Sequence, residues 1–244
     1  MSSLEFIGYG ASPISETLLK RALEIFQCNF AHAYGLTESC GTVLTLLPEF
    51  HDPEATNKER LRSCGRPVPW AEVALFDLET MLPVAQGEVG EICIRSGMTA
   101  KGYWNKPEAT AEAITADGWL RTGDAAYCDD EGFFYIHDRY KDMIVSGGEN
   151  IYPTEVENIL YEHPDVAETA VIGVPHPRWG ETPKAIVVCK PGQTIEAAAL
   201  LDFTRARLAR YKCPTSVEFV EQMPRNASGK ILKRELRAMI WPEK

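Results

Sequence analysis

The chain has 244 residues, of which 45% are hydrophobic and 25% are charged, with a formal net charge of −10. These values are typical of a folded globular chain and exclude a largely disordered protein, and the length allows one large domain or two ordinary ones. No apolar run approaches the roughly 20 residues that span a bilayer, the first residues lack a secretion signal, and the seven cysteines form no C-x-x-C pair. We therefore expect a cytoplasmic protein without a zinc ribbon or a disulfide framework.

The first part of the chain predicts a strand–helix–strand unit. Strands are expected over Leu4–Tyr9 and Phe30–Tyr34, and the helix between them over Ser15–Gln27, with Ser15 as its N-cap. This order is typical of a parallel sheet. Further along, short segments between Gly, Pro and Asp turns predict an antiparallel or barrel-like piece with little helix. Its strands are expected at Val73–Asp77, Glu91–Arg95, Trp119–Arg121 and Phe133–His137.

After Asp142 the pattern predicts a separate α+β unit of roughly 100 residues, an ordinary size for an independent domain. A strand comes first, and helices and strands then alternate. Helices are expected over Pro153–Tyr161, Ile195–Ala209 and Leu232–Ile240, and strands over Glu168–Val174, Ala185–Cys189 and Val217–Val220.

The charge balance also changes near Asp138. Residues 1–137 hold 20 acidic and 10 basic side chains, whereas residues 138–244 hold 15 of each. From Arg205 to Lys244 the basic side chains outnumber the acidic ones by 10 to 4, which would attract phosphate groups. For Arg205 to Arg210 the alternative is a solvated helix face. Nucleic-acid binding is disfavoured because the whole chain is acidic and lacks a basic-aromatic module.

The most informative segment covers residues 138–157 and reads DRYKDMIVSGGENIYPTEVE. Arg139 offers a planar fork of donors suited to hydroxyls or phosphate. Gly147 and Gly148 allow a backbone to approach something narrow that a Cβ would block. Pro153 suits the first turn of a helix. The alternative interpretation of this segment is an ordinary structural turn.

Three further segments carry groups suited to a nucleotide. In YGLTE at 34–38, an aromatic ring can cover a purine, a threonine can bond phosphate and a glutamate can hold Mg²⁺. In WLRTGD at 119–124, a carboxylate can accept from two ribose hydroxyls. In PRNASGK at 224–230, a flexible loop presents an ammonium, without the spacing of a Walker loop. The alternatives are a strand end with an N-cap threonine for the first segment and a turn aspartate for the second.

Taken in their order along the chain, these four segments closely resemble motifs of the AMP-forming acyl-CoA synthetases. These enzymes belong to the adenylate-forming superfamily, together with luciferases and peptide-synthetase adenylation domains. The matches are to the aromatic-G-x-T-E motif, the Y/W-x-R-T-G-D motif, the hinge motif and the terminal P-x-N-x-x-G-K motif. In addition, GYGASP at 8–13 resembles the GGA-x-x-P loop of the family, with Tyr9 in place of the usual glycine.

The resemblance implies a role for each matching residue in the adenylation step. Gly10, Ala11 and Ser12 would border the adenine, and Tyr34 would stack on it. Thr37 would meet the α-phosphate and Glu38 would bind Mg²⁺.

Two matching segments flank the predicted hinge. Asp124 and Arg139 would hold the ribose. Lys230 would bond the substrate carboxylate and the α-phosphate, as a fixed positive charge where negative charge accumulates in the transition state.

The resemblance also implies a second step with coenzyme A after a turn of the small domain about Lys141. Ser146, Gly147 and Gly148 would then wall a tunnel for the pantetheine thiol. Trp179 and Lys212 occupy positions where relatives contact the nucleotide end of coenzyme A, although a tryptophan is more often part of a core.

We thus expect an α/β and α+β architecture. Residues 1–137 would be the C-terminal portion of a large AMP-binding domain, with a parallel-sheet end and a barrel-like piece. Residues 138–142 would be a hinge, and residues 143–244 a small α+β domain. Nothing in residues 1–33 resembles the phosphate-binding loop of the family, so the N-terminal half of the enzyme is expected to be missing and the chain to be inactive alone.

The expected function is ATP-dependent activation of a carboxylic acid, a fatty acid foremost, and its transfer to coenzyme A. ATP, Mg²⁺ and coenzyme A are the expected cofactors, and peripheral contact with a membrane is compatible with this activity. Two alternatives stay open. One is a luciferase-like or carrier-protein-loading adenylating enzyme, and the other is a non-catalytic fragment that only binds AMP or coenzyme A.

Overall fold

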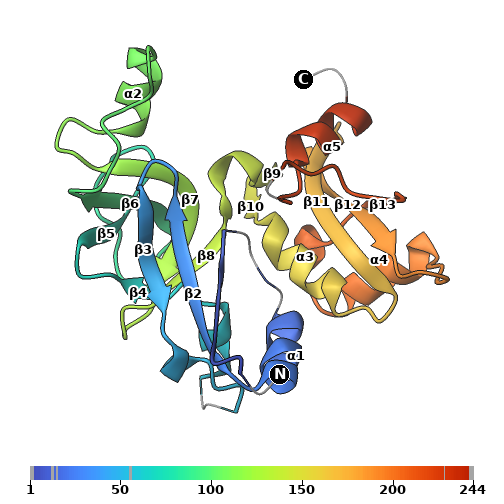
Figure 1. The fold of residues 1–244 in the computed structure, drawn as a ribbon. Coiled ribbons are helices and arrows are strands. Elements are labelled where there is room, and N and C mark those ends of the chain that lie inside the picture. The colour runs from blue at the N-terminus through green and yellow to red at the C-terminus, as the bar shows by residue number, and fades with distance from the viewer. Residues whose placement is uncertain (1–2, 12–13, 15, 55–56, 228, 242–244) are drawn as a thin grey trace. The chain divides into compact units, whose positions relative to one another are not determined.

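A computed structural model describes residues 3–11, 14, 16–54, 57–227 and 229–241 (Figure 1). The chain divides into two compact units, Met1–Tyr140 and Lys141–Lys244. This division falls inside the range 138–142 that the sequence predicts as a hinge. We describe each unit by itself.

The first unit begins with the predicted strand–helix–strand arrangement. Strand β1 (Phe6–Gly10) pairs in parallel with β2 (Asn29–Leu36), and α1 (Glu16–Phe26) connects them. The predicted N-cap at Ser15 lies outside the described residues. Helix α1 buries Leu19 against Phe30 and Leu61. Strands β3 (Gly41–Leu46) and β4 (Arg66–Pro67) extend the sheet in the order β1-β2-β3-β4 and were not predicted, nor were the 3₁₀ helices η1 (Pro48–Phe50) and η2 (Lys58–Arg62).

The second sheet of this unit is antiparallel, as predicted. It contains β5 (Ala71–Phe76), β6 (Gly90–Ser96), β7 (Leu120–Cys128) and β8 (Phe134–Arg139) in chain order. The short helix α2 (Pro107–Ala113) precedes β7 and was not predicted. Strand β7 is much longer than the predicted Trp119–Arg121, because it continues through Gly123, whose φ of +74° is accommodated where the pairing with β6 shifts register. One core joins Val43 and Leu44 of β3 to Ile92 and Ile94 of β6.

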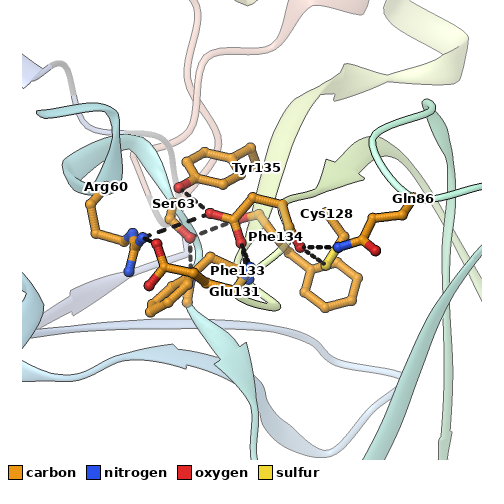
Figure 2. Close-up of polar contacts among 10 residues, drawn as sticks. Arg60, Ser63, Gln86, Cys128, Glu131, Phe133, Phe134 and Tyr135 are labelled. Atoms are coloured by element: carbon orange, nitrogen blue, oxygen red, sulfur yellow. Dashed lines mark hydrogen bonds and ion pairs between the residues drawn. The ribbon is translucent and has the colours of Figure 1, made fainter. Parts of the chain in front are cut away.

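A polar and aromatic cluster around Arg60 connects η2 to the turn between β7 and β8 (Figure 2). The Arg60 guanidinium lies over the ring of Phe133, 3.7 Å from its centroid, and forms an ion pair with Glu131. The Tyr135 hydroxyl donates to Asp129 Oδ2 over 2.9 Å. Segments about 70 residues apart in the chain are thereby held together, and the start of β8 is fixed from outside the sheet.

The second unit is one sheet with helices on both faces (Figure 1). Strands β10, β9, β12 and β11 are neighbours in that order, and β13 pairs with β12. The bounds are β9 (Ile144–Ser146), β10 (Glu149–Ile151), α3 (Pro153–Tyr161), β11 (Val166–His176), β12 (Gly180–Cys189), α4 (Ala197–Arg205), η4 (Arg210–Lys212), β13 (Ser216–Phe219) and α5 (Lys233–Ile240), after η3 (Tyr140–Asp142).

Alternation along β11 explains the two covered faces. Val171 packs in the cluster that contains Val156 of α3 and Leu200 of α4, whereas Ile172 packs in the cluster that contains Leu236 of α5. A strand buried on both faces reads as a continuous apolar run, which is how Ala170–Val174 appears in the sequence. The predicted order of elements is confirmed, except that the segment after Asp142 forms a hairpin of two strands and α4 ends at Arg205. Among the described residues, no helix is long and apolar enough to cross a membrane.

Candidate active site

Asp124 is the centre of the candidate site in the first unit. It lies inside β7, directly opposite Arg139 of β8 in the antiparallel pairing. Arg139 Nε lies 3.2 Å from Asp124 Oδ1, and the Tyr34 hydroxyl of β2 donates to Asp124 Oδ2 over 2.7 Å. The alternative of a turn aspartate is therefore wrong. Three of the residues predicted to contact the nucleoside come together from three strands and both sheets.

The Asp124 carboxylate is buried, with 6% of the residue exposed. Burial, followed by the neighbouring charge of Asp124, raises the pKa of Tyr34 well above its usual value. The phenol therefore stays protonated and acts as a donor at neutral pH. An ionised carboxylate offers about four lone-pair positions, and Asp124 receives the Tyr34 hydroxyl on one oxygen and pairs with Arg139 through the other.

Glu91 supports this site and was not predicted to do so. Its Oε1 accepts the backbone N–H of Gly123 over 2.9 Å, and its Oε2 accepts Arg121 Nε over 2.9 Å. Glu91 is only 2% exposed. One buried carboxylate thus holds both ends of the Arg-Thr-Gly stretch that precedes Asp124. A glutamate at the start of the apolar run GEICI is the sequence feature that could have pointed to it, since buried charges are retained only when paired.

Thr37 and Glu38 lie in the turn between β2 and β3. The alternative of a helix-capping threonine is wrong, because the turn leads directly into strand β3. The Tyr103 hydroxyl donates to Glu38 Oε1 over 2.6 Å, and the Ala100 N–H donates to the Glu38 carbonyl over 2.8 Å. Tyr103 was not predicted. It follows Gly102 and comes from a loop 65 residues away in sequence, so no local pattern connects it to Glu38.

A single carboxylate is a fitting but incomplete ligand for Mg²⁺. In the described part of the chain, no group of three or more His, Cys, Asp or Glu side chains could hold a metal ion. Mg²⁺ usually binds through one or two carboxylates together with substrate phosphates and water. Glu38 fits that arrangement with Oε2, since Tyr103 occupies Oε1.

The first predicted loop lies at the end of β1. A Cβ on Gly10 would come within 2.1 Å of the Ala33 carbonyl oxygen, so the glycine is required there by the close parallel strand. Ala11 follows with a φ of +63°, and Ser12 lies outside the described residues. Tyr9, which departs from the family pattern, bonds His51 Nε2 through its hydroxyl at 2.9 Å and packs its ring 4.9 Å from that of His32.

In the second unit, Lys230 ends a hydrogen-bonded turn. Its backbone N–H donates to Asn226 Oδ1 over 2.9 Å, and its carbonyl accepts the Asn226 N–H over 3.0 Å. Gly229, with a φ of +85°, makes this turn possible. The sequence predicts a flexible loop here. The structure shows hydrogen bonds between the two ends of this loop, from Asn226 to Lys230.

Four of the five predicted coenzyme A residues meet at the hairpin between β9 and β10. They are Ser146, Gly147, Gly148 and Trp179. Gly147 and Gly148 form its two-residue loop after Ser146, with φ values of +61° and +90°. Such a turn requires positive φ at both positions. The Gly147 N–H donates to the Trp179 carbonyl over 2.8 Å, and a Cβ on Gly147 would lie 2.8 Å from the indole ring. Trp179 is 43% exposed, so the alternative of a core tryptophan is wrong.

Lys212 ends η4 and pairs with Glu155 in the first turn of helix α3. Its Nζ lies 2.7 Å from both carboxylate oxygens of Glu155. Partial burial lowers the pKa of Lys212, but the bonds to Glu155 outweigh that effect, so the pKa is raised and the ammonium stays charged. Arg205 and Arg207 pair with Asp202 and Glu162, in agreement with a solvated helix face.

Lys141, the predicted hinge residue, lies in η3. It borders a cavity of about 200 Å³ in the second unit, which is lined by Lys141, Met143, Gly173, Glu181, Arg237 and Trp241.

Two family models match the chain. The model of the AMP-binding enzyme family matches residues 1–104, and the model of the AMP-binding enzyme C-terminal domain matches residues 155–230. Together they cover segments of both structural units.

Individual relatives agree with these models. The chain is 44% identical to a fatty acid–[acyl-carrier-protein] ligase of Streptomyces coeruleorubidus and 46% identical to a feruloyl-CoA synthase of an Amycolatopsis species, covering 96% and 97% of this chain but 44% and 46% of those proteins. The o-succinylbenzoate CoA synthetase of Bacillus subtilis, solved with an acyl-adenylate, superposes with a TM-score of 0.86 at 37% identity, over 97% of this chain and 46% of that one. The chain thus spans about half the length of these relatives.

Proposed function

Because the chain belongs to the adenylate-forming superfamily, we propose that it supplies the nucleoside site and the mobile unit of an AMP-forming ligase that joins a carboxylic acid to coenzyme A. The observation that carries this proposal is the convergence of Tyr34 and Arg139 on the buried carboxylate of Asp124. A buried acceptor between two fixed donors is suited to the paired hydroxyls of a ribose.

The first half-reaction forms an acyl-adenylate. A carboxylate oxygen of the acid attacks the α-phosphorus of ATP, a new P–O bond forms, and the bond to pyrophosphate breaks. Asp124 and Arg139 hold the ribose, and Thr37 contacts the α-phosphate. Lys230 places its ammonium against the oxygens that gain negative charge, the kind of interaction that stabilises a transition state most. Glu38 would hold Mg²⁺, which would supply positive charge to offset the negative charge on the pyrophosphate leaving group.

The second half-reaction transfers the acyl group. The thiol of coenzyme A attacks the acyl carbon, a thioester forms, and AMP leaves with the pair of electrons. Gly147 and Gly148 offer a turn without side chains for the thin pantetheine arm, and Trp179 offers a partly exposed ring beside it. Lys212 would have to exchange Glu155 for a phosphate of coenzyme A in order to take part.

The proposal also specifies the molecule that accepts the acyl group and the carboxylic acid that is activated. The relatives are named for ferulate, succinylbenzoate and fatty acids, and one is named for an acyl-carrier protein as acceptor. We favour coenzyme A and a fatty acid. Loading of a carrier protein is the second candidate, because the Streptomyces relative at 44% identity is named for it.

A completed enzyme tests the proposal. Here the chain is joined at its N-terminus to the corresponding half of the Amycolatopsis relative, which is 46% identical. We expect ATP–pyrophosphate exchange that depends on an added carboxylic acid, and thioester formation with coenzyme A. The 244-residue chain alone is expected to show no exchange, because no segment of it resembles the phosphate-binding loop. Robust exchange by the chain alone would contradict that expectation, and carrier-protein loading without thioester formation on coenzyme A would favour the second candidate.

Two variants of the completed enzyme separate the half-reactions. Lys230→Ala should slow adenylation roughly 10²- to 10³-fold, since a lost transition-state charge costs a few kcal/mol, and should spare thioester formation from preformed acyl-adenylate. Gly148→Leu should impair thioester formation and spare adenylation. Lys190→Ala, at a lysine on another face of the fold, is the control. Equal losses in both half-reactions for both variants would rule out this division of labour.

A further inference from the structure

Helix α5 carries two cations one turn apart, and each is bound to a carboxylate of a different element. Lys233 Nζ lies 2.8 Å from Glu157 Oε1, and Arg237 donates through a terminal guanidinium nitrogen to Asp142 Oδ1 over 2.8 Å. Residues four apart lie on the same face of a helix. The four side chains are only 14–28% exposed, so these contacts are less screened by solvent than surface ion pairs.

The two ion pairs connect the functional segments of the second unit. Helix α5 begins three residues after Lys230, Glu157 belongs to the helix that follows the Gly147-Gly148 hairpin, and Asp142 follows Lys141 in η3. Leu236, which lies between the two cations in sequence, is buried against the sheet. Helix α5 is therefore anchored in the core and touches both the hinge turn and the helix behind the hairpin.

A cavity of about 200 Å³ lies beside the hinge turn, with Lys141 and Met143 on its wall together with Arg237. On this side the turn therefore borders an open space. The bond from Arg237 to Asp142 crosses from α5 to this turn and ties the two together.

We propose that Arg237 is a positioning residue that fixes Asp142 to the second unit, so that backbone rotation is confined to Lys141 and the residues before it. A hinge absorbs a large change in φ and ψ at few residues. If Asp142 were loose, the rotation would spread over several residues, and the change from one orientation to the other would be slower. This positioning role rests on the proposed function. The contact between Arg237 and Asp142 is observed independently of that function.

The contact is tested in the 244-residue chain by amide hydrogen exchange of residues 140–144. Arg237→Ala should speed exchange there about tenfold, as expected when a charged hydrogen bond worth about 1.4 kcal/mol is lost. Asp142→Asn should have a similar effect. The matched control is Arg234→Ala, on the exposed side of the same helix. The reversed pair, Arg237→Asp with Asp142→Arg, should restore slow exchange. Exchange no faster than in the control would overturn the proposal.

The role is tested in the completed enzyme by rapid-quench kinetics. Arg237→Ala should form acyl-adenylate in a burst and then turn over several-fold more slowly, because the change of orientation has become limiting. A merely structural loss would depress both half-reactions together, and this result would overturn the positioning role. If the unmutated completed enzyme makes no acyl-adenylate, the proposed function fails, and the exchange experiment still decides the contact.

Discussion

In the first unit the candidate ribose ligand Asp124 is a buried carboxylate inside a strand, whereas in the second unit the candidate ligand groups stand on short turns. Asp124 is fixed by partners from β2 and β8, and Glu91 holds the backbone in front of it. Lys230 and Gly148, by contrast, are held by contacts within a few residues, in loops closed by glycine and asparagine.

This difference fits two kinds of work. A side chain that binds a nucleoside without moving binds it more tightly if it is rigid beforehand. Its conformational entropy is then lost during folding and not during binding. A group that is brought to the ligand in only one of two orientations needs exposure, and its local turn needs to survive the movement. The two units should therefore respond differently to mutation, and five predictions test how far the contrast extends.

The largest expected effect concerns independence of folding. Residues 143–244 alone should unfold cooperatively, with a free energy of about 5 kcal/mol, because their sheet is covered on both faces. A piece that starts at Lys141 should be about 1 kcal/mol more stable, since it retains the bond from Arg237 to Asp142. Chemical denaturation of both pieces measures this. A broad transition for the shorter piece would place the boundary elsewhere.

The second prediction tests the buried carboxylate of the first unit. Glu91→Ala should lower the free energy of unfolding of this unit by about 3 kcal/mol, because it leaves Arg121 and the Gly123 N–H without their buried acceptor. Glu91→Gln should cost less, as the amide oxygen can still accept one bond. Glu72→Ala, which breaks an exposed pair with Arg95 on the neighbouring strand, should cost at most about 0.5 kcal/mol. Equal losses at Glu91 and Glu72 would contradict the argument.

The third prediction compares the two glycines of the hairpin. Gly147→Ala should destabilise the second unit by about 2 kcal/mol, and Gly148→Ala by about 1 kcal/mol, because both strain a positive φ but only the first adds a contact with Trp179. In a Trp179→Ala background the two losses should become equal. Denaturation of these four variants, the unmutated chain and Trp179→Ala completes two double-mutant cycles. A difference that persists without the indole would exclude Trp179 as its cause.

The fourth prediction concerns the carboxylate proposed to bind Mg²⁺. Tyr103→Phe removes the donor to Glu38 Oε1. The Mg²⁺ concentration that half-saturates pyrophosphate exchange in the completed enzyme should rise a few-fold, about 1 kcal/mol, because the carboxylate is no longer held in one orientation. Direct binding of Mn²⁺ with ATP, followed by electron paramagnetic resonance, should weaken equally. Tyr211→Phe in the other unit is the control. Unchanged metal binding would show that Tyr103 only packs the loop.

The smallest effect is a pH dependence confined to the first unit. Burial lowers the pKa of both His32 and His51 from their usual 6.5. Below pH 6.5 the unfolded chain therefore takes up protons that the folded unit resists, so stability is complete above pH 6.5 and falls on acidification. His51→Gln, which keeps an acceptor for the Tyr9 hydroxyl, should flatten the dependence. A steeper fall in the second unit than in the first would contradict this prediction.

Most elements of the second unit could be predicted from the sequence, because residues inside or next to each element determine where it begins and ends. Helix α3 has the bounds that its proline and apolar spacing predict, and the two glycines form the expected turn. In the first unit the parallel pairing of β1 with β2 was predictable for the same reason. Of the side chains that the shared motifs predict for one site, the structure brings Tyr34, Asp124 and Arg139 into contact.

Contacts between segments distant in sequence determined the features that the sequence did not predict. Strands β3 and β4 exist because a neighbouring strand and a shared core stabilise short segments with weak patterns of their own. Glu91, Tyr103 and Arg237 act on the candidate residues from 32, 65 and 95 positions away. A hydrogen bond depends on distances of about 3 Å, and the composition around either partner does not encode which distant group the fold will bring that close.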